Sequence, residues 1–115
     1  MPIATINPCD GQLTKEFTAH SDFQVTEILK STSLAQRRWK DEGVFRRAQL
    51  LQAAATVLLE NESEFARLMT LEMGKPMKEA RAEIKKSAWV CTYYSQNAEK
   101  FLNIETSFVS FSTRA

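Results

Sequence analysis

The 115-residue sequence is poor in glycine, cysteine and histidine, and each shortage excludes a kind of site. Its three glycines form no glycine-rich dinucleotide-binding loop. Gly74-Lys75-Pro76 lacks both the upstream glycine and the following serine or threonine of a phosphate-binding loop, which favours a helix end. Two distant cysteines and His20 do not supply the roughly four closely spaced ligands of a structural zinc site. We therefore predict no metal-binding and no cofactor-binding residue in this chain.

The sequence also lacks an excess of charge of one sign. Fifteen basic residues against fourteen acidic ones leave a formal net charge of +1, so we expect no nucleic-acid partner. A local basic cluster is offset by Asp41 and Glu42, which is typical of a solvated helix–turn–helix surface. The cluster consists of Arg37, Arg38, Lys40, Arg46 and Arg47.

Long hydrophobic runs are missing as well. No stretch approaches the roughly 20 apolar residues that span a bilayer. The first eight residues show neither the basic leader nor the apolar run of a secretory signal. We therefore expect no membrane association and a cytoplasmic location, in which Cys9 and Cys91 stay reduced rather than forming a disulfide.

What the sequence contains is the composition of an ordinary globular protein, with 43% hydrophobic and 25% charged residues, in a length that suits one domain at most. Residues 4–19 predict a β-hairpin, because Asp10-Gly11 is a strong tight-turn dipeptide between two short β-like runs. An isolated hairpin is barely stable in water, so we expect this one to lie on another element.

Helical periodicity begins at Ser21, which has the capping-box spacing to Gln24. Apolar residues then recur every three or four positions as far as Lys40, where Asp41-Glu42-Gly43 predicts a turn. A second helix is predicted from Val44. Its apolar surface is broad, so we expect it to be largely buried.

Residues 61–64 interrupt the second helix, and a short third helix follows that is predicted to end at Gly74. Pro76 fits the first turn of a last helix over residues 76–102, which would be roughly 40 Å long. Weak alternation predicts one strand near Phe108–Phe111. The fold class is therefore a helix-rich α+β arrangement: a β-hairpin, three to four helices and a short terminal strand.

The sequence neighbours of the two cysteines and the histidine do not favour a catalytic role for any of them. Cys91 lies in mid-helix among apolar residues, far from the cation or helix amino terminus that would activate a thiol, which predicts a buried structural cysteine. Cys9 lies beside the hairpin turn and is expected to be exposed. His20 is placed in the loop before the first long helix, where no catalytic triad can be assembled around it. The charged residues of the last helix are expected on its wet side; they are Glu79, Arg81, Glu83 and Lys85.

Four segments resemble the aldehyde dehydrogenase family, and they occur in the family's order. Residues 6–11, Ile6-Asn7-Pro8-Cys9-Asp10-Gly11, resemble its opening Asn-Pro-x-x-Gly hairpin. Trp39 and the segment 46–51 resemble its first helix pair. Residues 68–76 contain its Glu-x-Gly-Lys-Pro motif, the most specific of the four, and residues 79–83 and 89–94 resemble the long helix that follows. Residues 69–76 and 88–94 are most similar to bacterial succinate-semialdehyde dehydrogenases.

The resemblance implies an incomplete piece of an aldehyde dehydrogenase fold, with residues 1–102 as the amino-terminal segment and residues 103–115 as a divergent, shortened tail. An internal deletion, a frameshift or a decayed gene would each produce such a tail. The family's members are oxidoreductases that convert an aldehyde, such as succinate semialdehyde, to a carboxylic acid with NAD or NADP. In that chemistry a cysteine thiolate attacks the aldehyde, an asparagine and backbone N–H groups stabilise the oxyanion, and a glutamate-activated water releases the acid.

The family's catalytic motifs have no counterpart in this chain. The only Gly-Gln pair, Gly11-Gln12, is not followed by the cysteine of Gly-Gln-x-Cys. Neither Trp39 nor Trp89 lies in a Pro-Trp-Asn-Phe-Pro segment, and Glu-Leu-Gly-Gly is absent. We therefore assign no catalytic residue and expect the chain alone to lack catalysis.

The helices of this chain are patterned to cover a larger body. Without that body we expect an exposed apolar patch beyond the few hundred Å² normal for a monomer. The patch would comprise Trp89, Val90, Tyr93, Tyr94, Phe101 and Leu102. We expect a marginally folded chain that associates with itself or with a dehydrogenase subunit through these faces. Two hypotheses stay open: a non-catalytic part of a longer dehydrogenase, and an independent helical module that binds an intact dehydrogenase subunit.

Overall fold

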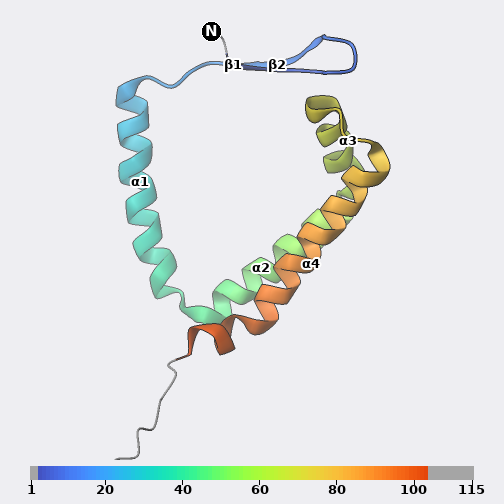
Figure 1. Ribbon diagram of the computed structural model, residues 1–115. Coiled ribbons are helices and arrows are strands. Elements are labelled where there is room, and N and C mark those ends of the chain that lie inside the picture. Colours follow the sequence, from blue (N-terminus) through green and yellow to red (C-terminus); the bar gives the residue numbers. More distant parts are fainter. Residues whose placement is uncertain (1–2, 104–115) are drawn as a thin grey trace, which may run out of the picture.

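The computed structural model describes residues 3–103, which form two strands followed by four helices (Figure 1). β1 (Ile3–Ile6) and β2 (Leu13–Phe17) pair antiparallel, with Ile3 opposite Phe17. The turn is held by the Asn7 side chain, whose Oδ1 accepts the backbone N–H of Cys9 at 3.0 Å. Gly11 has a φ of 71°, a conformation that glycine adopts without steric cost. The predicted hairpin is confirmed.

α1 (Asp22–Asp41) begins at the predicted capping box. Ser21 Oγ accepts the N–H of Gln24 at 3.3 Å, and Gln24 Oε1 accepts the N–H of Ser21 at 2.9 Å. The helix ends one residue after the expected Lys40, and Gly43, with a φ of 73°, turns the chain into α2 (Gly43–Glu60). None of the residues of α1 is buried, and Figure 1 shows this helix as a rod set apart from the other three.

α3 (Glu62–Met73) ends at Gly74, whose φ of 70° provides the expected left-handed cap. α4 (Met77–Leu102) then runs for 26 residues, or about 39 Å at 1.5 Å per residue. Pro76 was predicted in the first turn of this helix. It lies just before the helix instead, because its ψ of 138° is extended and the helical backbone starts at Met77. Its carbonyl oxygen accepts the N–H of Ala80 at 2.9 Å, which makes Pro76 the amino-terminal cap of α4.

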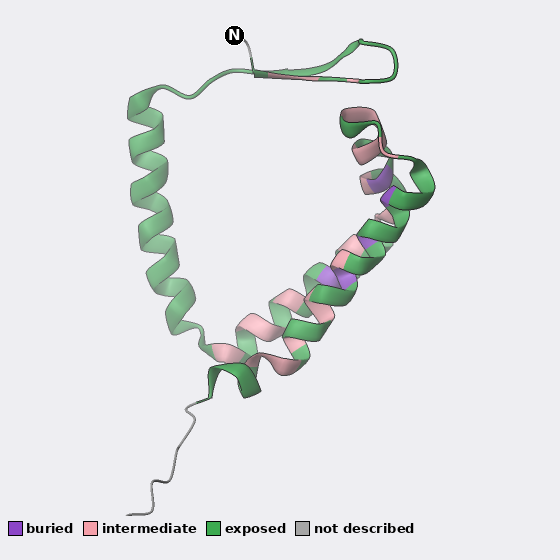
Figure 2. Ribbon diagram, in the orientation of Figure 1, coloured by how far each residue is buried: buried purple, intermediate pink, exposed green. Residues whose placement is uncertain are grey.

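The core is a narrow seam in which α4 packs against α2 and α3. Its buried residues are almost all small: Ala55, Ala66, Ala80, Ile84 and Ala88. Figure 2 shows the buried positions confined to the line where these helices meet. The expectation that α2 is largely buried is wrong, because only one of its 18 residues is buried. α4 covers one side of α2, whereas a neighbouring apolar row of α2, formed by Leu50, Ala54 and Val57, is exposed.

Polar side chains fix the register of α2 against α4 beside this alanine seam. Gln52 Nε2 donates to Thr92 Oγ1 at 3.3 Å, and Ser95 Oγ donates to Gln52 Oε1 at 2.9 Å. A sliding movement of one helix along the other would break both hydrogen bonds. The buried alanines let the backbones of the two helices approach closely, and the Gln52 hydrogen bonds fix their relative position along the helix axes.

The molecule is far more extended than a compact protein of its size. Its radius of gyration is 21.8 Å, whereas a compact chain of this length has about 13 Å. Its accessible surface is 10087 Å², against about 6,400 Å² for a globular protein of 13.1 kDa. The chain thus exposes roughly 3,700 Å² more surface than a self-contained domain.

Among the described residues, none of the helices is both long enough and apolar enough to cross a bilayer. The strand predicted near residues 108–111 lies outside the described residues.

Candidate functional site

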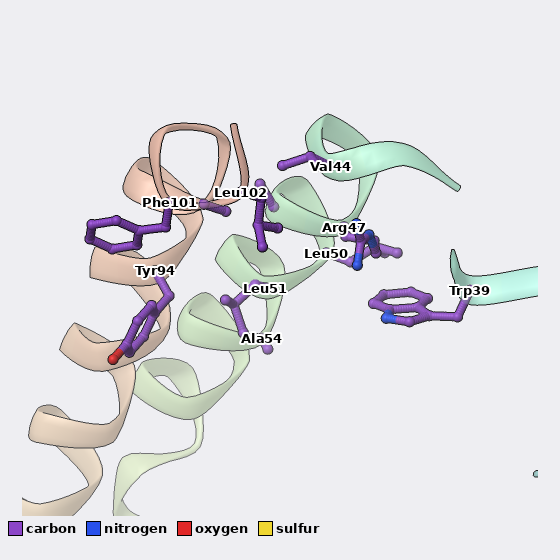
Figure 3. Close-up of a pocket in the computed structure, with 11 residues that line it drawn as sticks. Trp39, Val44, Arg47, Leu50, Leu51, Ala54, Tyr94, Phe101 and Leu102 are labelled. Carbon is purple, nitrogen blue, oxygen red and sulfur yellow. The ribbon is translucent and has the colours of Figure 1, made fainter. Parts of the chain in front are cut away.

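An apolar groove of about 500 Å³ lies where the end of α1, the first half of α2 and the last turns of α4 come together (Figure 3). In Figure 3, Tyr94 and Phe101 extend from α4 on one side, and Trp39 of α1 points toward Arg47 and Leu50 from the other. The groove is lined by Trp39, Val44, Arg47, Ala48, Leu50, Leu51, Ala54, Tyr94, Ala98, Phe101 and Leu102.

The groove follows from two apolar rows that the sequence places on adjacent helices. Leu50 and Ala54 are four residues apart on α2, and Tyr94, Ala98 and Phe101 follow at steps of four and three on α4, so each set lies on one helix face. α2 and α4 pack through their alanine seam, and the two rows form the walls of a trough beside it. The volume suits a small ligand, but such sites also carry several convergent polar groups.

Arg47 is the one charged residue among those that line the groove. The basic cluster was expected to be solvated, and four of its five members are exposed, whereas Arg47 is half-buried. Its Nε donates to the carbonyl oxygen of Gly43 at 3.3 Å, which ties the guanidinium to the first turn of α2. A single cation in an apolar trough provides little to orient a substrate, so the groove suits an apolar protein surface.

An aromatic face continues the groove along the outer side of α4; it consists of Trp89, Tyr93, Tyr94 and Phe101. The ring centroids of Trp89 and Tyr93 are 5.8 Å apart, and those of Tyr94 and Phe101 are 6.3 Å apart. Such spacings give favourable ring–ring contacts. Trp89 is nevertheless 62% exposed and Phe101 52% exposed. The predicted exposure of the apolar side chains at this end of α4, Val90 and Leu102 included, is confirmed.

The two cysteines and the histidine lie in three different parts of the structure. Cys9 is exposed in the hairpin turn, and His20 lies in the segment between β2 and α1, both as expected. Cys91 lies in the middle of α4 but is only half-buried, so the prediction of a buried cysteine is wrong. The reason is again that α2 and α3 cover only one side of α4.

Cys91 borders a shallow hollow that also contains Glu83, Lys86 and Ser87. Every residue around this hollow belongs to α4, so no second element brings a base or an oxyanion donor across from the thiol. Nucleophilic catalysis requires such a base within hydrogen-bond reach of the nucleophile. Within residues 3–103, no group of three His, Cys, Asp or Glu residues is placed to hold a metal ion.

The charged side of α4 is solvent-exposed, as its spacing predicted. Glu83 pairs with Lys75 of the preceding loop, and Lys85 reaches Glu62 at 3.8 Å. Arg81 donates to Ser63 Oγ at 3.2 Å. These contacts link the start of α4 to α3 and to the loop between them, at the end of the molecule opposite the groove.

The chain matches the aldehyde dehydrogenase family over residues 1–114. It is 41% identical over 102 residues to a probable NADP+ succinate-semialdehyde dehydrogenase of Synechocystis sp., covering 89% of this chain and 22% of that protein. It is 43% identical over 103 residues to the NADP+ succinate-semialdehyde dehydrogenase of Mycobacterium avium, again covering 89% of this chain and 22% of the relative.

The fold has solved counterparts. Succinic semialdehyde dehydrogenase from Streptococcus pyogenes, crystallised with NADP+ as its cofactor, superimposes with a TM-score of 0.82 at 28% sequence identity. The match covers 90% of this chain and 24% of that one. The chain therefore spans about a fifth to a quarter of the length of the proteins that it resembles.

Proposed function

Because the chain belongs to the aldehyde dehydrogenase family, we propose that it forms the amino-terminal helical layer of an enzyme that oxidises an aldehyde to a carboxylic acid. Its relatives support succinate semialdehyde as the aldehyde and NADP as the hydride acceptor, since the similar proteins carry that activity in their names. The role of these residues in the enzyme is structural: they cover a body that carries the chemistry.

The observation that carries this proposal is the uncovered apolar surface of a chain that spans 22% of its relatives. The surplus of roughly 3,700 Å² is several times the 800 Å² or so that each partner contributes to a standard interface. Covering 1,000 Å² of apolar surface is worth up to about 25 kcal/mol, more than the roughly 5–15 kcal/mol net stability of a typical domain. A surplus of this size fits packing within one fold rather than a transient encounter.

The catalytic residues are proposed to lie on that body. The hollow beside Cys91 is formed by α4 alone, so no second element faces its thiol there. The described residues also do not fit NADP. The apolar groove has one cation, Arg47, and the three glycines lie in the hairpin turn, at the junction of α1 and α2, and at the end of α3. None of them opens the strand-to-helix turn that holds a dinucleotide's phosphates.

A complementation assay tests the proposal. The partner is an NADP-dependent succinate-semialdehyde dehydrogenase from which the segment matching this chain has been removed. We expect neither polypeptide alone to reduce NADP with succinate semialdehyde, and the mixture to regain activity. Trp89→Ser with Phe101→Ser should abolish the gain, whereas Lys86→Ser, an exposed change on the same helix, should not. Turnover by the chain alone that Cys91→Ser abolishes would refute a purely structural role.

The second candidate function is an independent module that binds an intact dehydrogenase subunit. The continuity of the aromatic face with the groove favours it, because one partner surface could cover both. The two functions predict different partners. A covering layer binds the shortened dehydrogenase only, since the intact enzyme already fills the site with its own segment. A module also binds the intact enzyme, which titration calorimetry against both proteins would measure.

A further inference from the structure

Two motifs that are far apart in sequence meet in the structure. Pro8 belongs to the hairpin turn, and Gly74 ends α3 in the Glu72–Pro76 segment. A Cβ atom added to Gly74 would lie 2.9 Å from Cγ of Pro8 and 3.7 Å from its Cβ. Real Cβ atoms essentially never approach another atom to 2.9 Å, so the proline ring occupies the space that any side chain at residue 74 would need.

The turn that carries Pro8 is held by two backbone hydrogen bonds. The N–H of Asn7 donates to the carbonyl of Gln12 at 2.9 Å, and the N–H of Gly11 donates to the carbonyl of Asn7 at 2.8 Å. The proline ring adds a fixed φ to this hydrogen-bonded turn. Pro8 therefore cannot retreat from residue 74 without disturbing the hairpin.

The hairpin and α1, residues 3–42, form an arm that is otherwise poorly supported. α1 has no buried residue, and its apolar side chains Val25, Ile28 and Leu29 are 43%, 48% and 64% exposed. At one end the arm continues through Gly43 into α2, where Trp39 borders the groove. At the other end the hairpin lies beside the end of α3 (Figure 1).

We propose that the contact between Pro8 and Gly74 is a latch, which holds the arm at a fixed distance from the α2–α4 helices. With the latch closed, the exposed apolar side chains of α1 and the groove keep one arrangement before any partner arrives. The biological role of this latch rests on the proposed covering function. The latch itself is a property of the isolated chain and is tested without a partner.

The three glycines supply a matched control for the test. Gly74 has a φ of 70° and Gly43 a φ of 73°, so alanine suffers the same backbone strain at either position. At Gly43 an added Cβ meets nothing within 4 Å, whereas at Gly74 it meets Pro8. Gly74→Ala should therefore open the latch, and Gly43→Ala should not. Pro8→Ala combined with Gly74→Ala removes the colliding Cγ atom and should close the latch again.

The arm is followed with two spin labels, one on the exposed native Cys9 and one on Lys78→Cys, in a Cys91→Ser background. Labelled chain is mixed with excess unlabelled chain, so that only pairs within one molecule report. We expect a narrow distance peak in the reference and in Gly43→Ala, loss of that peak in Gly74→Ala, and its return in the double variant. Circular dichroism should show unchanged helix content throughout.

Three outcomes would overturn the latch. The narrow peak could survive Gly74→Ala, or the double variant could fail to regain it. An equal loss in Gly43→Ala would assign the effect to backbone strain. A binding assay with the shortened dehydrogenase then separates the two proposals. If the opened arm is correctly placed about a tenth of the time, the apparent Kd rises about tenfold. A reference chain that shows the peak but binds no dehydrogenase would refute the covering function alone.

Discussion

Replacing Ile84 with alanine should weaken the packing of α4 against α2 and α3. Ile84 is 4% exposed, and of the five buried residues in the part of the chain that the structure describes it is the one large side chain, since the other four are alanines. The substitution deletes three carbon atoms, and at about 0.8 kcal/mol per buried methylene it costs about 2.4 kcal/mol. That figure lies at the low end of the roughly 2–5 kcal/mol measured for such changes, because the narrow seam can collapse around the gap. The folding equilibrium should fall about 50-fold.

Urea titration followed by far-ultraviolet circular dichroism measures this loss. The matched control is Leu29→Ala, which also deletes three carbons from the middle of a helix, but from a side chain that is 64% exposed. Its effect should stay within about 0.5 kcal/mol. Ile84→Val should fall between the two, at about 0.8 kcal/mol for one carbon. Equal midpoints for Ile84→Ala and Leu29→Ala would show that the α2–α4 seam is not the stabilising core.

Three smaller perturbations test individual contacts. Ser21→Ala removes the capping oxygen and should cost α1 about 1 kcal/mol, seen as lower helicity of an isolated 19–42 peptide. Ser95→Ala removes the hydrogen bond to Gln52 and should destabilise the α2–α4 pair by about 1 kcal/mol in urea titration, while Ser95→Thr should retain most of the stability. Glu83→Gln breaks the exposed pair with Lys75 and should cost less than about 0.5 kcal/mol, a difference that added salt erases.

Features set by neighbours in sequence were predictable, and the structure confirms them. The capping box at Ser21 and the left-handed end at Gly74 depend on a few consecutive residues whose preferences are steric or involve one hydrogen bond. Pro76 shows the limit of such reasoning. Its fixed φ suits both the cap and the first helical residue, and only ψ, which the sequence does not specify, decided between them.

The burial of side chains, which depends on the elements that pack against a helix, was predicted less well. The broad apolar surface of α2 and the apolar neighbours of Cys91 both indicated burial, but only one residue of α2 is buried and Cys91 is only half-buried. Such a pattern is typical of a helix that other elements cover on several sides, but burial is a property of the neighbours that are present. The groove was missed for a related reason. Its apolar rows on α2 and α4 were visible, but nothing in a single sequence indicated that Trp39 of α1 would face them.

The uncovered faces of α1, α2 and α4 also bear on how long such a chain persists in a cell. Chaperones and proteases act continuously on poorly folded chains, and a change of one or two kcal/mol in stability can alter abundance several-fold. Within residues 3–103 only five residues are buried, four of them alanine, which leaves little stability to spare against degradation. We therefore expect its steady-state amount to rise and fall with the supply of the polypeptide that covers it.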